Sequence, residues 1–404
     1  MSSCTLPSAT APHLPPILEK PGQDILRPDI EWFPSYKVYK DRVEKLRQLH
    51  PNRPTTLPQG WPAQIDAERV WSGSDFKSED DYVFHFSSED VAEIELALAF
   101  FKSLPGELGP DDVKKDTFPL PSLGSRLEEV SRVIHEGRGF VVLRGLQPDK
   151  YSNFDNILLY LGITSYIAET RGLQDFDGRM LLHIQAVVED IKKHGSMPNS
   201  PYVARAQPFH TDLCDVLSLY ALDVAAYGGE SFLASSAKIY NEIARTRPDI
   251  IHVLASDDWI FDEPLPKPRP RLPILPPPPH RLALLPPPPL VPAMTELQAE
   301  ALDTVYFLAK EHAVEITLRK GDMQIFNNFA MLHARSSFVD DETARRHMLR
   351  LWLRNEERMW PTPPALEAVS FECYGDNEYR RNMVWDIEQS PPELRIKHRR
   401  ASCA

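Results

Sequence analysis

Cysteine is scarce in this chain, and its distribution excludes two kinds of site. The 404 residues contain 4 cysteines: Cys4, Cys214, Cys373 and Cys403. No two of them form a Cys-x-x-Cys pair, so the sequence predicts neither a zinc knuckle nor a disulfide scaffold. Free thiols fit a reducing compartment. We expect Cys214 to be a small, buried apolar side chain.

Long apolar runs and an excess of basic residues are absent as well. No window approaches the roughly 18 consecutive apolar residues of a membrane-spanning helix, and the first residues do not read as a secretory signal. The net charge of −13 argues against general binding to nucleic acids or anionic membranes. The short basic stretch 395–400 is expected to be a solvated tail. The sequence therefore predicts a cytoplasmic protein whose partner is neither a nucleic acid nor a membrane.

Proline is plentiful and unevenly distributed. Between Pro264 and Pro292 lie 14 of the 39 prolines, including two runs of four. Such runs lock the backbone and remove hydrogen-bond donors, so they favour polyproline II over the interior of a sheet. We predict a surface insertion over residues 264–292. It leaves little room there for strands of a barrel wall.

Two histidines and a carboxylate carry the strongest chemical signal. His210 and Asp212 are two residues apart, and at that spacing side chains of a β-strand point to the same side. His333 lies far downstream, after a second apolar segment. Two histidines and one carboxylate on one side of a metal are the ligand set of non-haem Fe(II) oxygenases. Taken alone, the pattern also fits a histidine and an aspartate that merely end a strand.

A strand-like segment with two arginines is the second signal. The alternation in residues 345–353 puts four side chains on one face: Arg346, Met348, Arg350 and Trp352. An arginine among apolar residues is costly unless it meets an anion, and its planar fork suits a carboxylate. Upstream, a Gly-Gly turn precedes the hydroxyl of Ser231.

The triad, the arginine segment and the hydroxyl together resemble the taurine dioxygenase (TauD/TfdA) family of Fe(II)/2-oxoglutarate-dependent oxygenases. The similarity covers roughly residues 115–355 and is strongest in 208–238 and 315–354. The resemblance implies that Fe(II) is held by three residues: His210, Asp212 and His333. It implies a reaction in which 2-oxoglutarate and O₂ yield succinate and CO₂ while an unactivated C–H bond is oxidised. Ascorbate is an optional supporting reductant.

The same resemblance assigns roles around the iron. It places the arginine that binds 2-oxoglutarate at Arg350 and a hydroxyl donor to the 2-oxoglutarate carboxylate at Ser231. Arg346 is expected to assist the co-substrate or to hold an anionic group of the substrate. The alternatives are a structural ion pair for Arg350, a solvated ion pair for Arg346 and a turn-capping role for Ser231. His183 is expected to be a core histidine rather than part of the pocket.

The periodicities by themselves indicate only mixed α and β; the resemblance implies an α+β fold with a mainly β core, a double-stranded β-helix (jelly roll) with helical buttresses. We predict a proline-rich arm and helical cover over residues 1–114, an oxygenase domain over 115–355 that contains the insertion, and a tail over 356–404. Capping boxes predict helix starts at Ser87 and Thr295. The oligomeric state has no signature in the sequence.

Three functional hypotheses follow. The first is an oxygenase acting on a small metabolite that is amino-acid-like or carboxylated. The second applies the same chemistry to a sulfonate, as the family name implies. The third is a non-catalytic jelly-roll scaffold whose polyproline segment binds partners of the SH3 or WW kind. The intact triad and Arg350 argue against the scaffold, because a decayed site has no reason to keep them.

Overall fold

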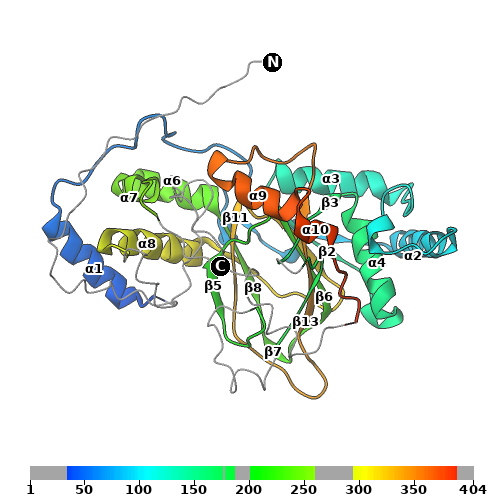
Figure 1. The fold of residues 1–404 in the computed structure, drawn as a ribbon. Helices are drawn as coiled ribbons and strands as arrows, with labels where there is room; N and C mark the ends of the chain where they lie inside the picture. Colours follow the sequence, from blue (N-terminus) through cyan, green and yellow to red (C-terminus); the bar gives the residue numbers. More distant parts are fainter. Residues whose placement is uncertain (1–33, 176–177, 187–200, 260–293, 389–404) are drawn as a thin grey trace.

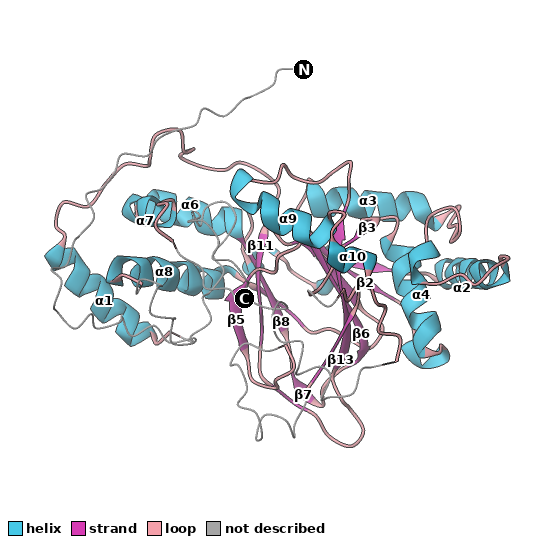
Figure 2. Cartoon of the chain, viewed as in Figure 1, coloured by secondary structure: helices cyan, strands magenta, loops and turns pink. Residues whose placement is uncertain are grey.

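The computed structural model describes residues 34–175, 178–186, 201–259 and 294–388 of the chain. Strands occupy the middle of the molecule, and helices lie on both sides of them (Figure 1; Figure 2). The fold is therefore mixed α and β with several sheets, as expected. Among the described residues, no helix combines the length and apolar character needed to cross a membrane.

The larger sheet has seven strands in the order β1-β2-β10-β6-β13-β3, and β4 also pairs with β13. Its strands are β1 (Val83–His85), β2 (Phe140–Arg144), β3 (Thr170–Arg171), β4 (Leu182–Gln185), β6 (Val216–Asp223), β10 (Met323–Asn327) and β13 (His347–Arg354). The alternation predicted for β13 is confirmed. Leu349 and Leu351 pack in the cluster under the helices, whereas Met348 and Trp352 belong to the cluster between the sheets.

The smaller sheet has four strands in the order β5-β11-β8-β9, and a separate pair joins β12 to β7. These strands are β5 (Gln207–His210), β7 (Tyr227–Gly228), β8 (Ser231–Ser235), β9 (Val314–Ile316), β11 (Met331–Arg335) and β12 (Phe338–Val339). Buried side chains of both sheets, such as Phe140, Leu217, Leu233 and Met331, form one cluster. The two sheets therefore face each other across a shared core.

Helices cover the outer face of each sheet. The larger sheet is covered by α2 (Ser88–Ser103), α3 (Leu123–His135) and α4 (Asn153–Thr164). The smaller sheet is covered by α6 (Ser236–Thr246), α7 (Pro248–Leu254) and α8 (Glu296–His312), and α1 (Tyr36–Leu49) lies against α8. Both predicted capping boxes are confirmed: Ser87 with Asp90 begins α2, and Thr295 with Gln298 begins α8.

The N-terminal part contributes a strand as well as helices. Strand β1 pairs in parallel with β2, with Val83 opposite Val142. Its three residues are too few for an alternating pattern to show, so the sequence predicted only a helical cover there. The proline-rich segment 264–292 and the arm before residue 34 lie outside the described residues.

The C-terminal part packs onto the sheets through α9 (Glu367–Tyr374) and α10 (Glu378–Arg381). Val369 and Cys373 of α9 are buried in the cluster between the sheets. At the end of β13, Arg354 forms an ion pair with Asp215, with Nε and Oδ2 2.6 Å apart. Packing therefore continues beyond residue 355, in the polar segment whose position the sequence left open.

Candidate active site

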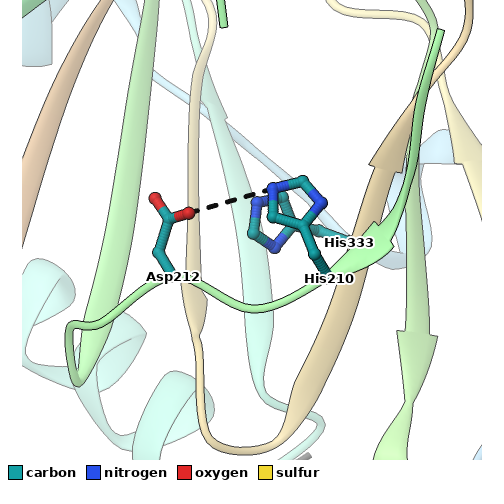
Figure 3. A group of neighbouring side chains, drawn as sticks. All are labelled: His210, Asp212 and His333. Atoms are coloured by element: carbon teal, nitrogen blue, oxygen red, sulfur yellow. Dashed lines mark ion pairs between the residues drawn. The ribbon is translucent and has the colours of Figure 1, made fainter. Parts of the chain in front are cut away.

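The predicted metal ligands come together at the end of β5. His210 is the last residue of that strand and lies opposite His333 of β11, with the two ring centres 4.0 Å apart. Asp212 points toward them from the loop that follows (Figure 3). One potential ligand atom from each residue lies within 4.8 Å of the others. The expectation that His210 and Asp212 share a strand was wrong in detail, because β5 stops at His210 and Asp212 reaches the site from a loop.

Local hydrogen bonding orients the ring of His210. Its Nδ1 lies 2.8 Å from the carbonyl oxygen of Pro208. A carbonyl only accepts, so Nδ1 carries the proton and Nε2 keeps a free lone pair. That Nε2 lies 3.8 Å from Oδ1 of Asp212. Burial lowers the pKa of His210 and, well below its usual value, that of His333. Both imidazoles are therefore neutral, which is the form that binds metals.

The two oxygens of Asp212 have different surroundings. Oδ2 accepts hydrogen bonds from Nη1 of Arg350 at 2.9 Å and from Nε1 of Trp352 at 3.0 Å. Oδ1 is buried and has no hydrogen-bond partner. Burial raises the pKa of Asp212, but the positive charge of Arg350 and the hydrogen bond from Trp352 are among the interactions that outweigh it, and the net pKa is lowered. The side chain is therefore a carboxylate with one committed oxygen and one available oxygen.

These residues fit a divalent metal ion. Nδ1 of His333, like Oδ1 of Asp212, is a buried polar atom without a hydrogen-bond partner. Unpaired buried polar atoms are rare in folded proteins, because each carries a desolvation cost of about 1–3 kcal/mol. Oδ1 of Asp212, the free Nε2 of His210 and a ring nitrogen of His333 make a nitrogen and oxygen donor set. A metal ion held there would satisfy the unpaired Oδ1.

Asn328 clamps the loop that carries Asp212, and the sequence reasoning missed it. Its Oδ1 accepts from the backbone N–H of Asp212 at 2.9 Å, and its Nδ2 donates to the carbonyls of Asp212 and Cys214 at 2.7 and 2.6 Å. Asn328 itself lies in the turn between β10 and β11, five residues before His333. It thus ties the two halves of the triad together. Its closeness to His333 in the sequence was the one feature that could have indicated a role at the site.

A pocket opens beside the triad and contains the other predicted residues. It encloses about 560 Å³ of space between atoms, including its opening to solvent. Its lining includes the triad, Ser231, Arg346, Arg350, Arg335 and apolar side chains such as Ile184, Leu217 and Leu219.

The arginines of this pocket have unequal partners. Arg350 bonds Asp212 and also donates through Nε to Oε1 of Gln174 at 2.9 Å. Arg335 donates to the carbonyls of Val203 and Arg205, both at 2.8 Å. By contrast, Nε and Nη1 of Arg346 are buried without any hydrogen-bond partner.

A glycine turn places Ser231 in the pocket. Gly228 and Gly229 have φ values of +74° and +84°, a region that only glycine adopts readily. A Cβ on Gly228 would lie 2.2 Å from the carbonyl oxygen of Ser337, so no other residue fits there. The hydroxyl of Ser231 donates to Oε1 of Gln324 at 2.9 Å. Its proton is therefore already used within the protein.

Two other residues behave as expected and lie outside the pocket lining. His183 is buried, with Nδ1 2.8 Å from Nε2 of His347 and Nε2 2.6 Å from the carbonyl of Asp386. It is a satisfied core histidine. Cys214 is fully buried and unpaired, and burial raises its thiol pKa well above the usual value.

Known proteins resemble this chain over most of its length. Residues 101–352, more than half of the chain, match the family described as "Taurine catabolism dioxygenase TauD, TfdA family". The taurine hydroxylase-like protein SAT17 of Stachybotrys chartarum is 36% identical over 351 residues, which are 81% of this chain and 89% of that protein. The FR-33289 synthase of Streptomyces rubellomurinus is 24% identical over 271 residues, which are 62% of this chain and 79% of that protein.

A solved structure shares the fold. Asparagine oxygenase in complex with Fe(II), 2S,3S-3-hydroxyasparagine and succinate aligns with a TM-score of 0.52 and 16% identity, over 68% of this chain and 93% of that one. At this identity the structural likeness shows a shared fold and nothing more. The family match and the relative at 36% identity show common ancestry. The chain therefore belongs to the TauD/TfdA family and is a non-haem Fe(II)/2-oxoglutarate-dependent oxygenase.

Proposed function

We propose that this enzyme oxidises an unactivated C–H bond of a small, anionic metabolite that is amino-acid-like or carboxylated, with release of succinate and CO₂. The two facing sheets would form the double-stranded β-helix, which holds the site between them. The observation that carries the proposal is the convergence of one potential ligand atom each from His210, Asp212 and His333 to within 4.8 Å of one another, where Oδ1 of Asp212 is buried without a partner. These residues would hold Fe(II).

Fe(II) and 2-oxoglutarate, when bound, would activate O₂, which is the oxidant for the C–H bond, while the decarboxylation of 2-oxoglutarate supplies the other two electrons that O₂ accepts. The residues of the chain bind and orient the reactants and limit the access of water. His210 offers Nε2 because its other nitrogen is held by Pro208. Apolar side chains such as Leu217 and Leu219 line the pocket beside the ligands. A partly apolar lining strengthens the charge interactions within the site.

Arg346 is the best supported anchor for the distal carboxylate of 2-oxoglutarate. The sequence resemblance placed this role at Arg350, but Arg350 is already held by Asp212 and Gln174. Arg346 is 6% exposed and has two unpartnered nitrogens, and its planar fork matches a carboxylate. Burial lowers its pKa to about 10, so it stays charged at neutral pH. Ser231 lines the same pocket and is a minor contributor, because its proton is shared with Gln324.

The charge of the pocket supports an anionic substrate. Among its described lining residues, three guanidinium groups face a single carboxylate, that of Asp212. Bound Fe(II) adds two positive charges, and 2-oxoglutarate brings two negative ones. A net positive charge remains and would attract a carboxylate or a sulfonate. The fold shared with asparagine oxygenase agrees with an amino-acid-like substrate, whereas the likeness to a taurine hydroxylase-like protein favours a sulfonate as the second candidate.

An anaerobic titration followed by a turnover assay tests this function. Fe(II) and 2-oxoglutarate together should give a visible charge-transfer band with the wild-type protein and with His252→Gln, a substitution on the outer helix α7. His333→Ala should abolish the band. Succinate formation in air should then be stimulated by anionic members of a panel that contains amino acids, other carboxylates, sulfonates and uncharged compounds. A band of wild-type strength in His333→Ala would refute the metal site, and stimulation by neutral compounds alone would refute the anionic substrate.

A further inference from the structure

We propose that Trp352 is a positioning residue that, with Arg350 and Gln174, restricts Asp212 to binding a metal through Oδ1 alone. The proposal rests on the metal site assigned above. It concerns how one oxygen of the carboxylate is reserved for the metal while the other is withheld.

The contacts converge on a single atom. Oδ2 of Asp212 accepts from Nη1 of Arg350 at 2.9 Å and from Nε1 of Trp352 at 3.0 Å. A carboxylate oxygen has about two lone-pair sites, so two donors fill it. Oδ1 of the same group accepts no hydrogen bond and lies nearest to His210. The carboxylate is therefore prepared in one orientation by the protein itself.

Both donors are themselves held in place. Trp352 is 2% exposed, packs in the cluster between the sheets, and lies under the guanidinium of Arg350, whose central carbon is 5.0 Å from the ring centre. Gln174 is fully buried; its Oε1 accepts from Nε of Arg350 at 2.9 Å, and its Nε2 donates to the Arg350 carbonyl at 3.3 Å. The guanidinium can only donate and the carbonyl can only accept, which fixes the orientation of this amide.

The orientation of Asp212 determines how many coordination positions on the metal remain free. A carboxylate that binds through one oxygen occupies one position on a metal, and one that binds through both occupies two. Oxygenases of this kind need open positions for 2-oxoglutarate and O₂. With Oδ2 filled by Trp352 and Arg350, Asp212 takes a single position. Trp352 thus acts on the metal through Asp212 and without touching it.

Cobalt(II), whose absorption reports coordination number, tests the proposal without turnover. Trp352→Phe should weaken Co(II) binding about 10- to 100-fold, the usual effect of removing a partner of a metal ligand, and should alter the Co(II) spectrum. Trp71→Phe is the matched control. Trp71 is 5% exposed and packs in the same cluster, but its Nε1 donates to the Arg138 carbonyl at 2.8 Å. This control should leave affinity and spectrum unchanged.

A second variant keeps the proposal testable if Trp352→Phe folds poorly. Replacing Trp352 with β-(3-benzothienyl)alanine substitutes sulfur for the N–H and keeps the shape of the side chain. The same loss of affinity and spectral change are expected, with an unaltered melting temperature in the absence of metal. Wild-type affinity and spectrum in this variant would overturn the proposal.

The wild-type protein and His210→Ala separate this proposal from the proposed function. If His210→Ala binds Co(II) as the wild type does, the triad is not the metal site, and both proposals fail. If the wild type binds through the triad and the Trp352 variants match it, only the positioning role fails.

Discussion

Replacement of Arg346 by methionine should make the ligand-free protein more stable and its binding of 2-oxoglutarate weaker. Burial lowers the pKa of Arg346 from 12.5 to about 10, which corresponds to an unfavourable free energy of about 3 kcal/mol for the charged side chain in the folded protein. Because the folded pKa is the lower one, this cost is present in full below about pH 10 and declines only as the pH rises toward 12.5.

Part of the stabilisation gained by removing the buried charge of Arg346 is offset by lost packing. The Arg346 guanidinium lies 5.4 Å from the ring centre of Phe338, a contact that contributes about 0.5–2 kcal/mol. The net stabilisation at pH 7 should be about 1–2 kcal/mol, a rise in melting temperature of about 2–4 °C. In the same variant, loss of the charge-assisted hydrogen bonds of the guanidinium should weaken the binding of 2-oxoglutarate by about 1.5–3 kcal/mol, or about 10- to 150-fold.

Thermal melting under anaerobic conditions with Fe(II), with and without 2-oxoglutarate, measures both effects. The co-substrate should raise the wild-type melting temperature, by linkage, and barely move that of Arg346→Met. Arg350→Met is the control from the same pocket. It should lower the melting temperature, because it breaks a buried ion pair with Asp212. A less stable Arg346→Met variant that keeps the full response to 2-oxoglutarate would refute the reasoning and return the anchoring role to Arg350.

Three further predictions concern the loop, the hydroxyl and the thiol. Asn328→Asp should weaken Co(II) binding about 10- to 100-fold, because its carboxylate would face the Asp212 and Cys214 carbonyls that Asn328 now donates to; an unchanged titration would contradict the clamp. Ser231→Ala should weaken the binding of 2-oxoglutarate less than about tenfold, since the hydroxyl already donates its proton to Gln324. A larger loss of affinity in the charge-transfer titration would show a direct contact between Ser231 and the co-substrate. Cys214 should escape iodoacetamide at pH 8 until the protein is denatured, because burial raises its pKa; mass spectrometry of the native protein would reveal any modification.

Several features were accessible from the sequence because they depend on local spacing. The Ser87–Asp90 and Thr295–Gln298 boxes mark helix starts through contacts three residues apart. The alternation in β13 follows from the two-residue period of a strand, which separates Leu349 from Arg350 whatever lies opposite. In the same way, the close spacing of His210 and Asp212 limited where a metal site could lie.

Partners from distant segments were decided by the tertiary structure alone. By spacing alone Arg346 and Arg350 are equivalent, since both occupy one face of one segment, and only the family resemblance favoured Arg350 as the 2-oxoglutarate anchor. Only the packing of β13 beside the loop after β5 gives Arg350 a carboxylate and leaves Arg346 with unpartnered nitrogens. The same packing brings Asn328 onto the backbone of Asp212, across 116 residues of chain. Periodicity determines which way a side chain points along its own element; what it meets there depends on how the elements pack together.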